Sequence, residues 1–224
     1  GDATRFHVAH HGVDPAVFHP VSDDELRRVA ESLGLGGRRY VAFLGTLEPR
    51  KNLSALVRGW SAAARNFADP PALVLAGGRG WDAALDDEVA RVDPRLTVLR
   101  PGYLPLGDLA GFLGGAEVVA YPSLGEGFGL PVLEAMACGA VVLTSRMLSL
   151  PEVGGDSVAY CGTRDEDVAA ALGELLSDGG RRADLRRRAV RRAAQFTWEA
   201  SARAHRAAFE AAVIHRRVPG FRVG

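Results

Sequence analysis

Cysteine is scarce in this sequence: among 224 residues only Cys138 and Cys161 are cysteines, and their spacing matches no metal motif. Two thiols of this kind suit a reduced intracellular protein better than a disulfide scaffold. Neither sign of charge is in excess, with 27 Lys plus Arg against 27 Asp plus Glu, which disfavours a protein that coats duplex nucleic acid. No apolar run approaches the roughly 18 residues of a membrane span. Apolar residues still make up 47% of the chain, which excludes wholesale disorder and allows a sizeable core.

Lysine is rarer still. Lys51 is the only lysine among 27 basic residues, so every other cation is an arginine. The composition as a whole leans towards Arg, Ala, Gly, Val and Leu, so a single lysine can arise by chance. It can also mark a position that requires a compact ammonium group, because a planar guanidinium is not equivalent to it.

Short apolar runs bounded by glycine and proline alternate with helical patterns along most of the chain. Runs of this length suit strands that are buried on both faces of a parallel sheet. The expected strands are 39–45, 72–77, 95–100, 117–123, 140–145 and 157–161. The first helix of this region is expected to start at Asn52, a suitable N-cap, and the others are 82–92, 106–114, 131–138, 165–177, 180–194 and 198–214. The alternation predicts an α/β fold, a Rossmann-like doubly wound parallel sheet of about six strands, with ligands at the carboxyl ends of the strands.

The helix expected at 180–194 contains seven arginines. One interpretation is a surface that binds nucleic acid or an anionic membrane. Leu185, Ala189 and Ala193 form a separate apolar stripe on the same helix. We therefore expect the arginines to form its solvated face.

The segment 121–139 carries the strongest chemical signal. A strand ends at Ser123 and is followed by the glycine-rich turn 124–129, and Pro131 then suits the first turn of a helix. Glycines let the backbone approach a ligand, and free amides together with the helix dipole favour an anion at such a helix start. A phosphate is the natural candidate, and a tight turn into a buried helix is the alternative.

Two carboxylates bracket this turn. Glu126 lies in the loop and Glu134 in what we expect to be the first turn of the helix, with seven residues between them. A carboxylate beside a phosphate repels it, so these two groups suit hydroxyls instead, as an acidic residue does for a ribose in dinucleotide sites. Hydroxyls and phosphate together indicate a nucleotide or a nucleotide sugar.

A second stretch, 43–53, directly follows the first expected strand. Arg50 and Lys51 stand just before the helix start at Asn52, where the helix dipole disfavours cations. The placement makes sense if an anion lies between the two cations. A diphosphate fits, with arginine as a bidentate clamp and lysine as a point charge; a solvated basic turn is the alternative.

Taken together, these stretches resemble family 4 glycosyltransferases. EGFGLPVLEAMACG (126–139), with its Glu-x7-Glu spacing, resembles the donor-site signature of that family. Stretches that agree with it in order and spacing are GTLEPRKNL (45–53), AGGRGW (76–81), PGYLPLGDLAGFLGGAEVVAYPS (101–123) and SLPEVGGDS (149–157). HHGVDPAVFHP (10–20) is similar to the family's interdomain segment, although Asn is more usual at His11, and FTWEASA (196–202) to the start of its last helix. The resemblance spans about residues 8–214.

The resemblance implies a GT-B enzyme, in which two Rossmann-like domains face each other across a cleft. This chain matches only the C-terminal, donor-binding domain, so the acceptor-binding N-terminal domain is its missing partner. We expect an interdomain segment at 1–20, a nucleotide-sugar-binding domain at 21–214 and a tail at 215–224. The implied reaction is a retaining transfer of a hexose from a GDP- or UDP-type sugar to a glycan or lipid. The PRKN stretch (49–52) resembles members that transfer mannose.

The resemblance also implies roles for individual residues. Arg50 and Lys51 hold the donor diphosphate, and Glu134 binds the ribose hydroxyls. Glu126 contacts the donor sugar and positions the reacting carbon, which makes it the implied catalytic residue. The other donor-binding positions are Gly45, Thr46, Gly102, Tyr103, Leu104, Gly127, Phe128, Gly129 and Leu130. Many members carry Arg where Thr46 stands, which leaves more of the diphosphate to the other two cations.

Several further expectations follow. Such enzymes need no bound metal or other cofactor, and His7, His10 and His11 lack a spaced carboxylate or cysteine to complete a metal site. We expect no nucleic-acid partner, no transmembrane segment, and a cytoplasmic location that reaches the inner membrane face in the full-length enzyme. A non-catalytic nucleotide-binding or interaction module on the same fold is the alternative. A dinucleotide-dependent oxidoreductase is disfavoured, because no G-x-G-x-x-G follows the first strand.

Overall fold

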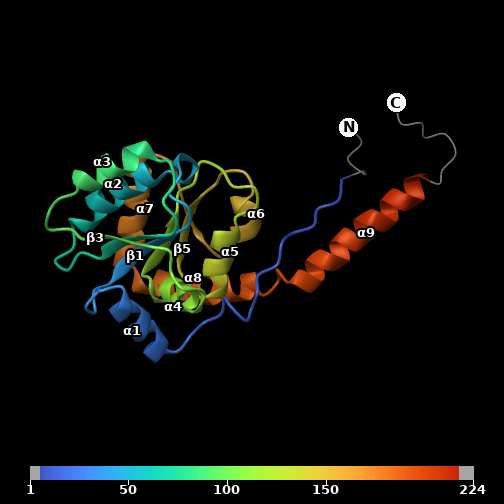
Figure 1. The fold of residues 1–224 in the computed structure, drawn as a ribbon, viewed down its shortest axis with the longest axis horizontal. Coiled ribbons are helices and arrows are strands. Elements are labelled where there is room, and N and C mark those ends of the chain that lie inside the picture. The colour runs from blue at the N-terminus through green and yellow to red at the C-terminus, as the bar shows by residue number, and fades with distance from the viewer. Residues whose placement is uncertain (1–5, 217–224) are drawn as a thin grey trace.

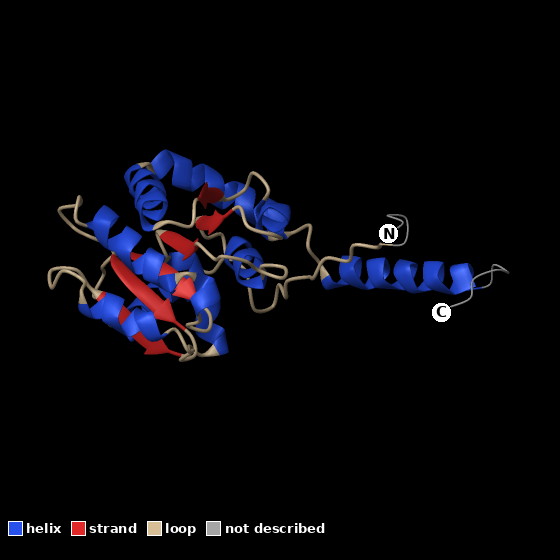
Figure 2. Ribbon diagram, turned by 90° about the horizontal axis from the view of Figure 1, so that it is seen from above, coloured by secondary structure: helices blue, strands red, loops and turns tan. Residues whose placement is uncertain are grey.

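The structure, a computed structural model, describes residues 6–216. Its centre is a parallel sheet of six strands, in the order β3-β2-β1-β4-β5-β6 (Figure 2). The strands are β1 (Tyr40–Leu44), β2 (Ala72–Ala76), β3 (Val98–Gly102), β4 (Val118–Tyr121), β5 (Val142–Ser145) and β6 (Ala159–Cys161). The strand order reverses between β1 and β4, and ligands of such sheets bind at that switch point. The predicted doubly wound α/β fold is therefore confirmed.

Helices cover both faces of the sheet (Figure 1). On one face α2 (Leu53–Ala64) packs between α3 (Ala83–Ala90) and α7 (Asp165–Ser177). On the other, α1 packs against α4 and α5 against α8. The bounds of those helices are α1 (Asp23–Ser32), α4 (Leu109–Gly115), α5 (Leu130–Ala137) and α8 (Gly179–Ala193). Short helices complete the layers at α6 (Leu150–Gly154), η2 (Pro49–Lys51) and η3 (Leu106–Asp108).

Two features of this architecture differ from the sequence prediction. The third strand runs over Val98–Gly102 instead of 95–100. It is the half-exposed edge strand, so it needs no continuous apolar run and it tolerates Pro101. The sequence analysis also missed α1, whose start is fixed by the Ser22 side chain accepting a hydrogen bond from the amide of Glu25.

The arginines of α8 correct a second expectation, because several of them point inward. Arg186 donates to the carbonyl oxygens of Gly114, Ala116 and Gly139, which lie at the carboxyl ends of α4 and α5. Arg182 bonds in the same way to the end of α7, and Arg192 to that of α6. Cations at helix carboxyl ends satisfy free carbonyls and complement the dipole. This face of α8 therefore ties four helices together, whereas Arg187 and Arg191 face solvent.

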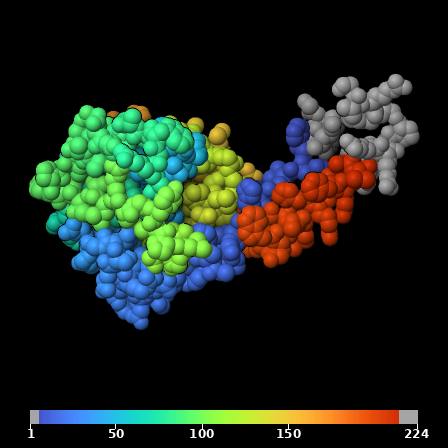
Figure 3. Space-filling view, in the orientation of Figure 1, coloured from blue at the N-terminus to red at the C-terminus, as the bar shows by residue number. Residues whose placement is uncertain are grey.

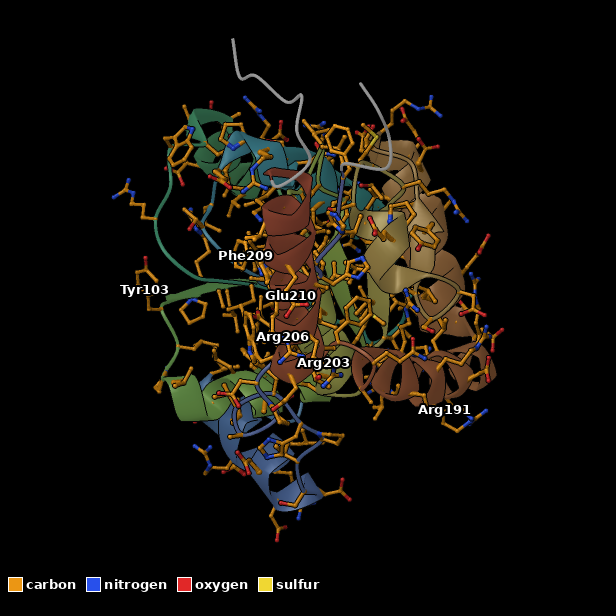
Figure 4. All side chains as sticks on the ribbon, turned by 90° about the vertical axis from the view of Figure 1, so that its right-hand side faces the viewer. Tyr103, Arg191, Arg203, Arg206, Phe209 and Glu210 are labelled. Atoms are coloured by element: carbon orange, nitrogen blue, oxygen red, sulfur yellow. The ribbon has the colours of Figure 1, made fainter. Side chains whose placement is uncertain are left out.

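Beyond the sheet, α9 (Trp198–Arg216) extends away from the body, and the chain from residue 6 onwards runs back beside it (Figure 1). The helix continues two residues past the predicted end at 214, and the rest of the expected tail lies outside the described residues. Phe209 and Val213 are exposed on α9. In Figure 4 α9 stands upright in front of the body, with Phe209 and Glu210 labelled along it. Residues 6–20 contain no helix or strand.

Candidate functional site: a charged cluster at the switch point

Three charged side chains meet where the sheet order reverses. Arg50 and Lys51 lie on the η2 turn after β1, and Glu126 lies in the glycine-rich loop after β4. Lys51 Nζ is 2.7 Å from Glu126 Oε1, and Arg50 forms an ion pair with the other oxygen of the same carboxylate. Arg50 also bonds to Glu48 Oε1 at 2.5 Å. The structure thus brings together the two cations and the loop carboxylate that the sequence singled out.

The cluster is protected from solvent to different degrees. The side chains of Lys51 and Glu126 are only 7% and 9% exposed, whereas that of Arg50 is 48% exposed. Burial alone raises the pKa of Glu126, but hydrogen bonds and charge from Lys51 and Arg50 outweigh it and hold that pKa below its usual range. Glu126 is therefore ionised at neutral pH, and its charge is shared between two cations.

Backbone contacts fix the η2 turn against the glycine-rich loop. The amide of Leu124 donates to the carbonyl of Arg50 at 2.9 Å, and Arg50 donates to the carbonyl of Gly125 at 3.0 Å. Asn52 adopts a left-handed conformation with φ 59°. Its side chain does not cap α2 as predicted; it donates instead to the carbonyls of Pro122 and Thr163. The Asn52 amide group thereby ties three loops together.

The start of α5 offers hydrogen-bond donors beside this cluster. Gly129 is the N-cap with φ 101°, a conformation that favours glycine, and Pro131 lies in the first turn. Neither the Gly129 nor the Leu130 amide donates to any residue that the structure describes. An open hollow of about 570 Å³ borders the same loop, lined by Arg50, Leu124, Gly125, Glu126, Gly127 and Leu148. Free amides, a helix dipole and a half-exposed guanidinium together suit an anion.

Glu134 differs from Glu126 in its surroundings. It lies in the second turn of α5, not in the first as predicted, and it is half-buried. Its carboxylate forms no ion pair with any described side chain, and burial raises its pKa above the ordinary value. A carboxylate in this position has unused acceptor capacity, which hydroxyl groups can fill.

The predicted positions Gly45, Thr46 and Gly102 lie along the carboxyl edge of β1, β2 and β3. A Cβ on Gly77 would lie 2.1 Å from the carbonyl oxygen of Gly45, so these strand ends touch, and the Gly77 amide donates to Gly102. Thr46 is exposed beside them. A hollow of about 420 Å³ opens here, lined by Leu47, Leu75, Gly77, Arg79, Asp86, Arg100 and Gly102.

Tyr103 and Leu104 lie outside that hollow. Tyr103 is 82% exposed and lies at the edge of the body (Figure 4), with its hydroxyl against Gly78. Leu104 is half-buried against the core. The structure therefore places both near the β2 and β3 ends without bringing them to the charged cluster.

Some residues around the cluster were not predicted. Glu48 forms an ion pair with Arg50, as Glu126 does. Ser149 Oγ donates to the carbonyl of Glu126 at 2.8 Å, and Leu148 lines the hollow. Phe128 is a predicted donor-binding position, but its packing against His11, with ring centroids 5.0 Å apart, was not predicted. Of these contacts, only the pairing of Glu48 with Arg50 could have been found in the sequence, because the two residues are two positions apart. The other contacts join loops that are far apart in sequence.

Among residues 6–213, whose side chains the structure describes, no group of three or more His, Cys, Asp or Glu could hold a metal ion. No helix in the same part of the chain is both long enough and apolar enough to cross a bilayer.

Comparison with known proteins supplies the family. The model for glycosyl transferases group 1 matches residues 27–194. The O-antigen chain mannosyltransferase B of Escherichia coli is 36% identical over 187 residues, which are 81% of this chain and 48% of that protein. The D-inositol 3-phosphate glycosyltransferase of Salinispora tropica is 35% identical over 213 residues, 88% of this chain and 44% of that protein. The chain thus spans about half the length of the curated relatives it matches.

Solved structures share the fold. Anabaena HepE, crystallised with UDP and glucose, superposes with a TM-score of 0.79 at 19% identity, over 91% of this chain and 56% of that one. The C-terminal domain of the group 1 protein LpcC from Francisella tularensis has a TM-score of 0.69 at 19% identity, and the match covers 82% of this chain and 97% of that domain. The fold agrees with these solved structures, and the family model covers most of the sequence. The chain belongs to the glycosyl transferases group 1.

Proposed function

We propose that this chain is the donor-binding domain of a retaining hexosyltransferase of family 4. The enzyme transfers a hexose from a nucleoside-diphosphate sugar to a glycan or lipid, and mannose is the hexose that we propose. One observation carries the proposal: Arg50 and Lys51 meet Glu126 at the switch point, and the nearby amides of Gly129 and Leu130 donate no hydrogen bond to any described residue. Two cations and a helix start are what a departing diphosphate requires.

The geometry supports a division of labour between the two cations. Lys51 is buried and faces Glu126 alone among the described carboxylates, so it serves as a fixed point charge. Arg50 is half-exposed at the rim of the hollow and can turn from Glu126 and Glu48 towards a diphosphate. Guanidinium binds phosphate bidentately, so the exchange replaces one charge-assisted pair by another. The donor then needs no metal to neutralise its leaving group.

The remaining donor contacts follow from the same placement. Glu134, with no cation beside it, accepts hydrogen bonds from the ribose hydroxyls. The base lies along the edge formed by Gly102, Tyr103 and Leu104, and Gly45 with Thr46 forms the wall towards the diphosphate. Glu126 faces the hollow, where the donor sugar lies.

The acceptor is bound by a second, N-terminal domain. The matched relatives are about twice as long as the matched region, and α9 exposes Phe209 and Val213 away from the body, where another domain can cover them. The mannosyltransferase among the relatives supports mannose as the sugar. We place the reaction in the cytoplasm, at the inner membrane face when the acceptor is a lipid.

A thermal-shift panel tests the proposal on the 224-residue chain. GDP, UDP, ADP and their sugar derivatives are compared, with NAD as the control compound. Ligand at 100 times its dissociation constant stabilises by about 2.7 kcal/mol, and each kcal/mol raises the melting temperature by roughly 2–4 °C. We expect a rise of about 5–11 °C with one nucleoside diphosphate. A rise with NAD alone, or with none of the nucleotides, would contradict the proposal.

A further inference from the structure

The N-terminal segment, residues 6–20, touches the glycine-rich loop through two histidines. His11 meets the ring of Phe128 edge-on, with centroids 5.0 Å apart and the planes at 89°. His10 lies 5.9 Å from the same ring, and its Nε2 is 2.6 Å from Glu152 Oε1 on α6. Figure 3 shows the segment, in blue, between the yellow part of the body and the orange-red α9.

The opposite side of the segment is fixed by the junction between α8 and α9. The amide of Val13 donates to the carbonyl of Phe196 at 3.0 Å. A Cβ on Gly12 would lie 2.3 Å from the backbone nitrogen of Trp198, so the two backbones are in direct contact. Phe196 also packs against His10 and Phe128, at 5.6 and 6.1 Å between centroids. The two histidines and Phe196 therefore pack around the Phe128 ring.

Phe128 and Glu126 anchor the loop through their side chains, in addition to the hydrogen bonds made by its backbone. The neighbours of Phe128, Gly127 and Gly129, have no side chains, and Glu126 is held by Lys51 and Arg50. The amides of Gly129 and Leu130 directly follow Phe128. The Leu130 amide shares a peptide plane with the Gly129 carbonyl, which is held by hydrogen bonds from the first turn of α5, so the helix itself fixes its direction. The direction of the Gly129 amide depends on where Phe128 is held, because glycines on both sides of Phe128 leave the backbone free to rotate.

Glu152 is suited to a positioning role. Its backbone carbonyl accepts from Arg192 at 2.7 Å, so α6 is fixed to α8. Among described residues, His10 is the only ion-pair partner of its carboxylate. Both side chains are about half-exposed, and such a pair contributes little to overall stability. Its effect is on geometry, since it links residues 142 positions apart in sequence.

We propose that His10, His11 and Glu152 are positioning residues that hold Phe128, and through it the amide of Gly129, in place for the donor diphosphate. The inference rests on the proposed function. It adds that the orientation of the N-terminal segment, and of any domain preceding it, sets the donor affinity of this domain. No contact between these three residues and the donor is required.

Two variants and two readouts test this proposal on the full 224-residue chain. His11→Ala and Glu152→Gln are compared with His205→Ala, a histidine on α9 that bonds only to its own helix. Hydrogen–deuterium exchange of residues 124–130 is measured without nucleotide. Binding of the nucleoside diphosphate that stabilises the wild-type chain most is measured by calorimetry. We expect faster exchange in 124–130 and about 2- to 10-fold weaker binding for His11→Ala, with a smaller effect for Glu152→Gln.

A conservative variant separates positioning from general destabilisation. His11→Phe keeps the edge-to-face contact and should restore both readouts, which a role through charge or hydrogen bonding would not allow. Unchanged exchange and unchanged affinity in both test variants would overturn the proposal. If the wild-type chain binds no nucleotide, the proposed function fails, and the exchange of residues 124–130 still decides the positioning proposal by itself.

Discussion

Glu126 lies in the loop before α5 and Glu134 in the second turn of that helix, and the two carboxylates are held in opposite ways. The Glu126 side chain is only 9% exposed, yet two cations keep its pKa below the ordinary 4.5. Glu134 is half-buried without a cation, and burial raises its pKa above the same value. Burial opposes ionisation in both places, so the neighbouring charges decide the outcome.

The contrast separates two uses of a carboxylate in one site. Glu126 pairs with Lys51 and Arg50, and in the proposed site it thereby sets their positions for an anion. Glu134 has no cation beside it, and in the proposed site its acceptor capacity serves the ribose at some cost to the folded state. A carboxylate that stabilises the fold and one that reduces its stability should respond to pH and to substitution with opposite signs.

The largest expected effect is the loss of stability in Glu126→Gln. The change leaves Lys51 buried without its counter-charge, and breaking such a pair costs about 3 kcal/mol. The folded-state pKa of Glu126 is lowered, so its contribution is present above the unfolded value and is lost as pH falls through the folded pKa. We therefore expect the deficit relative to wild type, measured by urea unfolding, to be full at neutral pH and to shrink as the pH falls below 4.5.

The exposed Glu31 on α1 provides the control. Glu31→Gln should change the free energy of unfolding by less than about 0.5 kcal/mol, as surface substitutions do. A Glu126→Gln chain as stable as this control at neutral pH would mean that the cluster does not hold the loop.

The next effect in size concerns Lys51. In the proposed site Lys51→Ala removes a buried positive charge beside the diphosphate. A loss the size of one charge-assisted hydrogen bond, about 1.5–3 kcal/mol, should lower the affinity for a nucleoside diphosphate roughly 10- to 150-fold. Calorimetric titration measures this affinity. The control is Arg187→Ala, which removes a cation from the solvent face of α8. Equal affinities in the two variants would remove Lys51 from the site.

The sequence was sufficient for the doubly wound sheet and for a ligand site at the carboxyl ends of its strands. Strands buried on both faces must be apolar throughout, which makes them visible, and parallel strands bring the residues after β1 and β4 to one edge. The sequence did not reveal that Glu126 neutralises both cations. That depends on how the η2 turn docks against the loop, and on the left-handed Asn52 that ties them together.

Other features could not be predicted because their partners are carbonyls or rings from distant segments. The spacing of the α8 arginines showed an amphipathic helix, but the carbonyls that Arg186 meets belong to the ends of α4 and α5. The contact between His11 and Phe128 likewise joins residues far apart in sequence. Periodicity locates a buried face and does not identify what lies opposite it.

The smallest expected effect is that of Glu134→Gln, and its sign is opposite to that of Glu126→Gln. The folded-state pKa of Glu134 is raised, so its charge reduces stability above the folded pKa, and this penalty disappears as pH falls below the unfolded value. The variant should therefore be slightly more stable than wild type at neutral pH. Its affinity for a nucleoside diphosphate should fall only about 2- to 13-fold, the range for one ordinary hydrogen bond to a hydroxyl. The same urea and calorimetric measurements decide the case, since a less stable variant with full affinity would make Glu134 a structural residue.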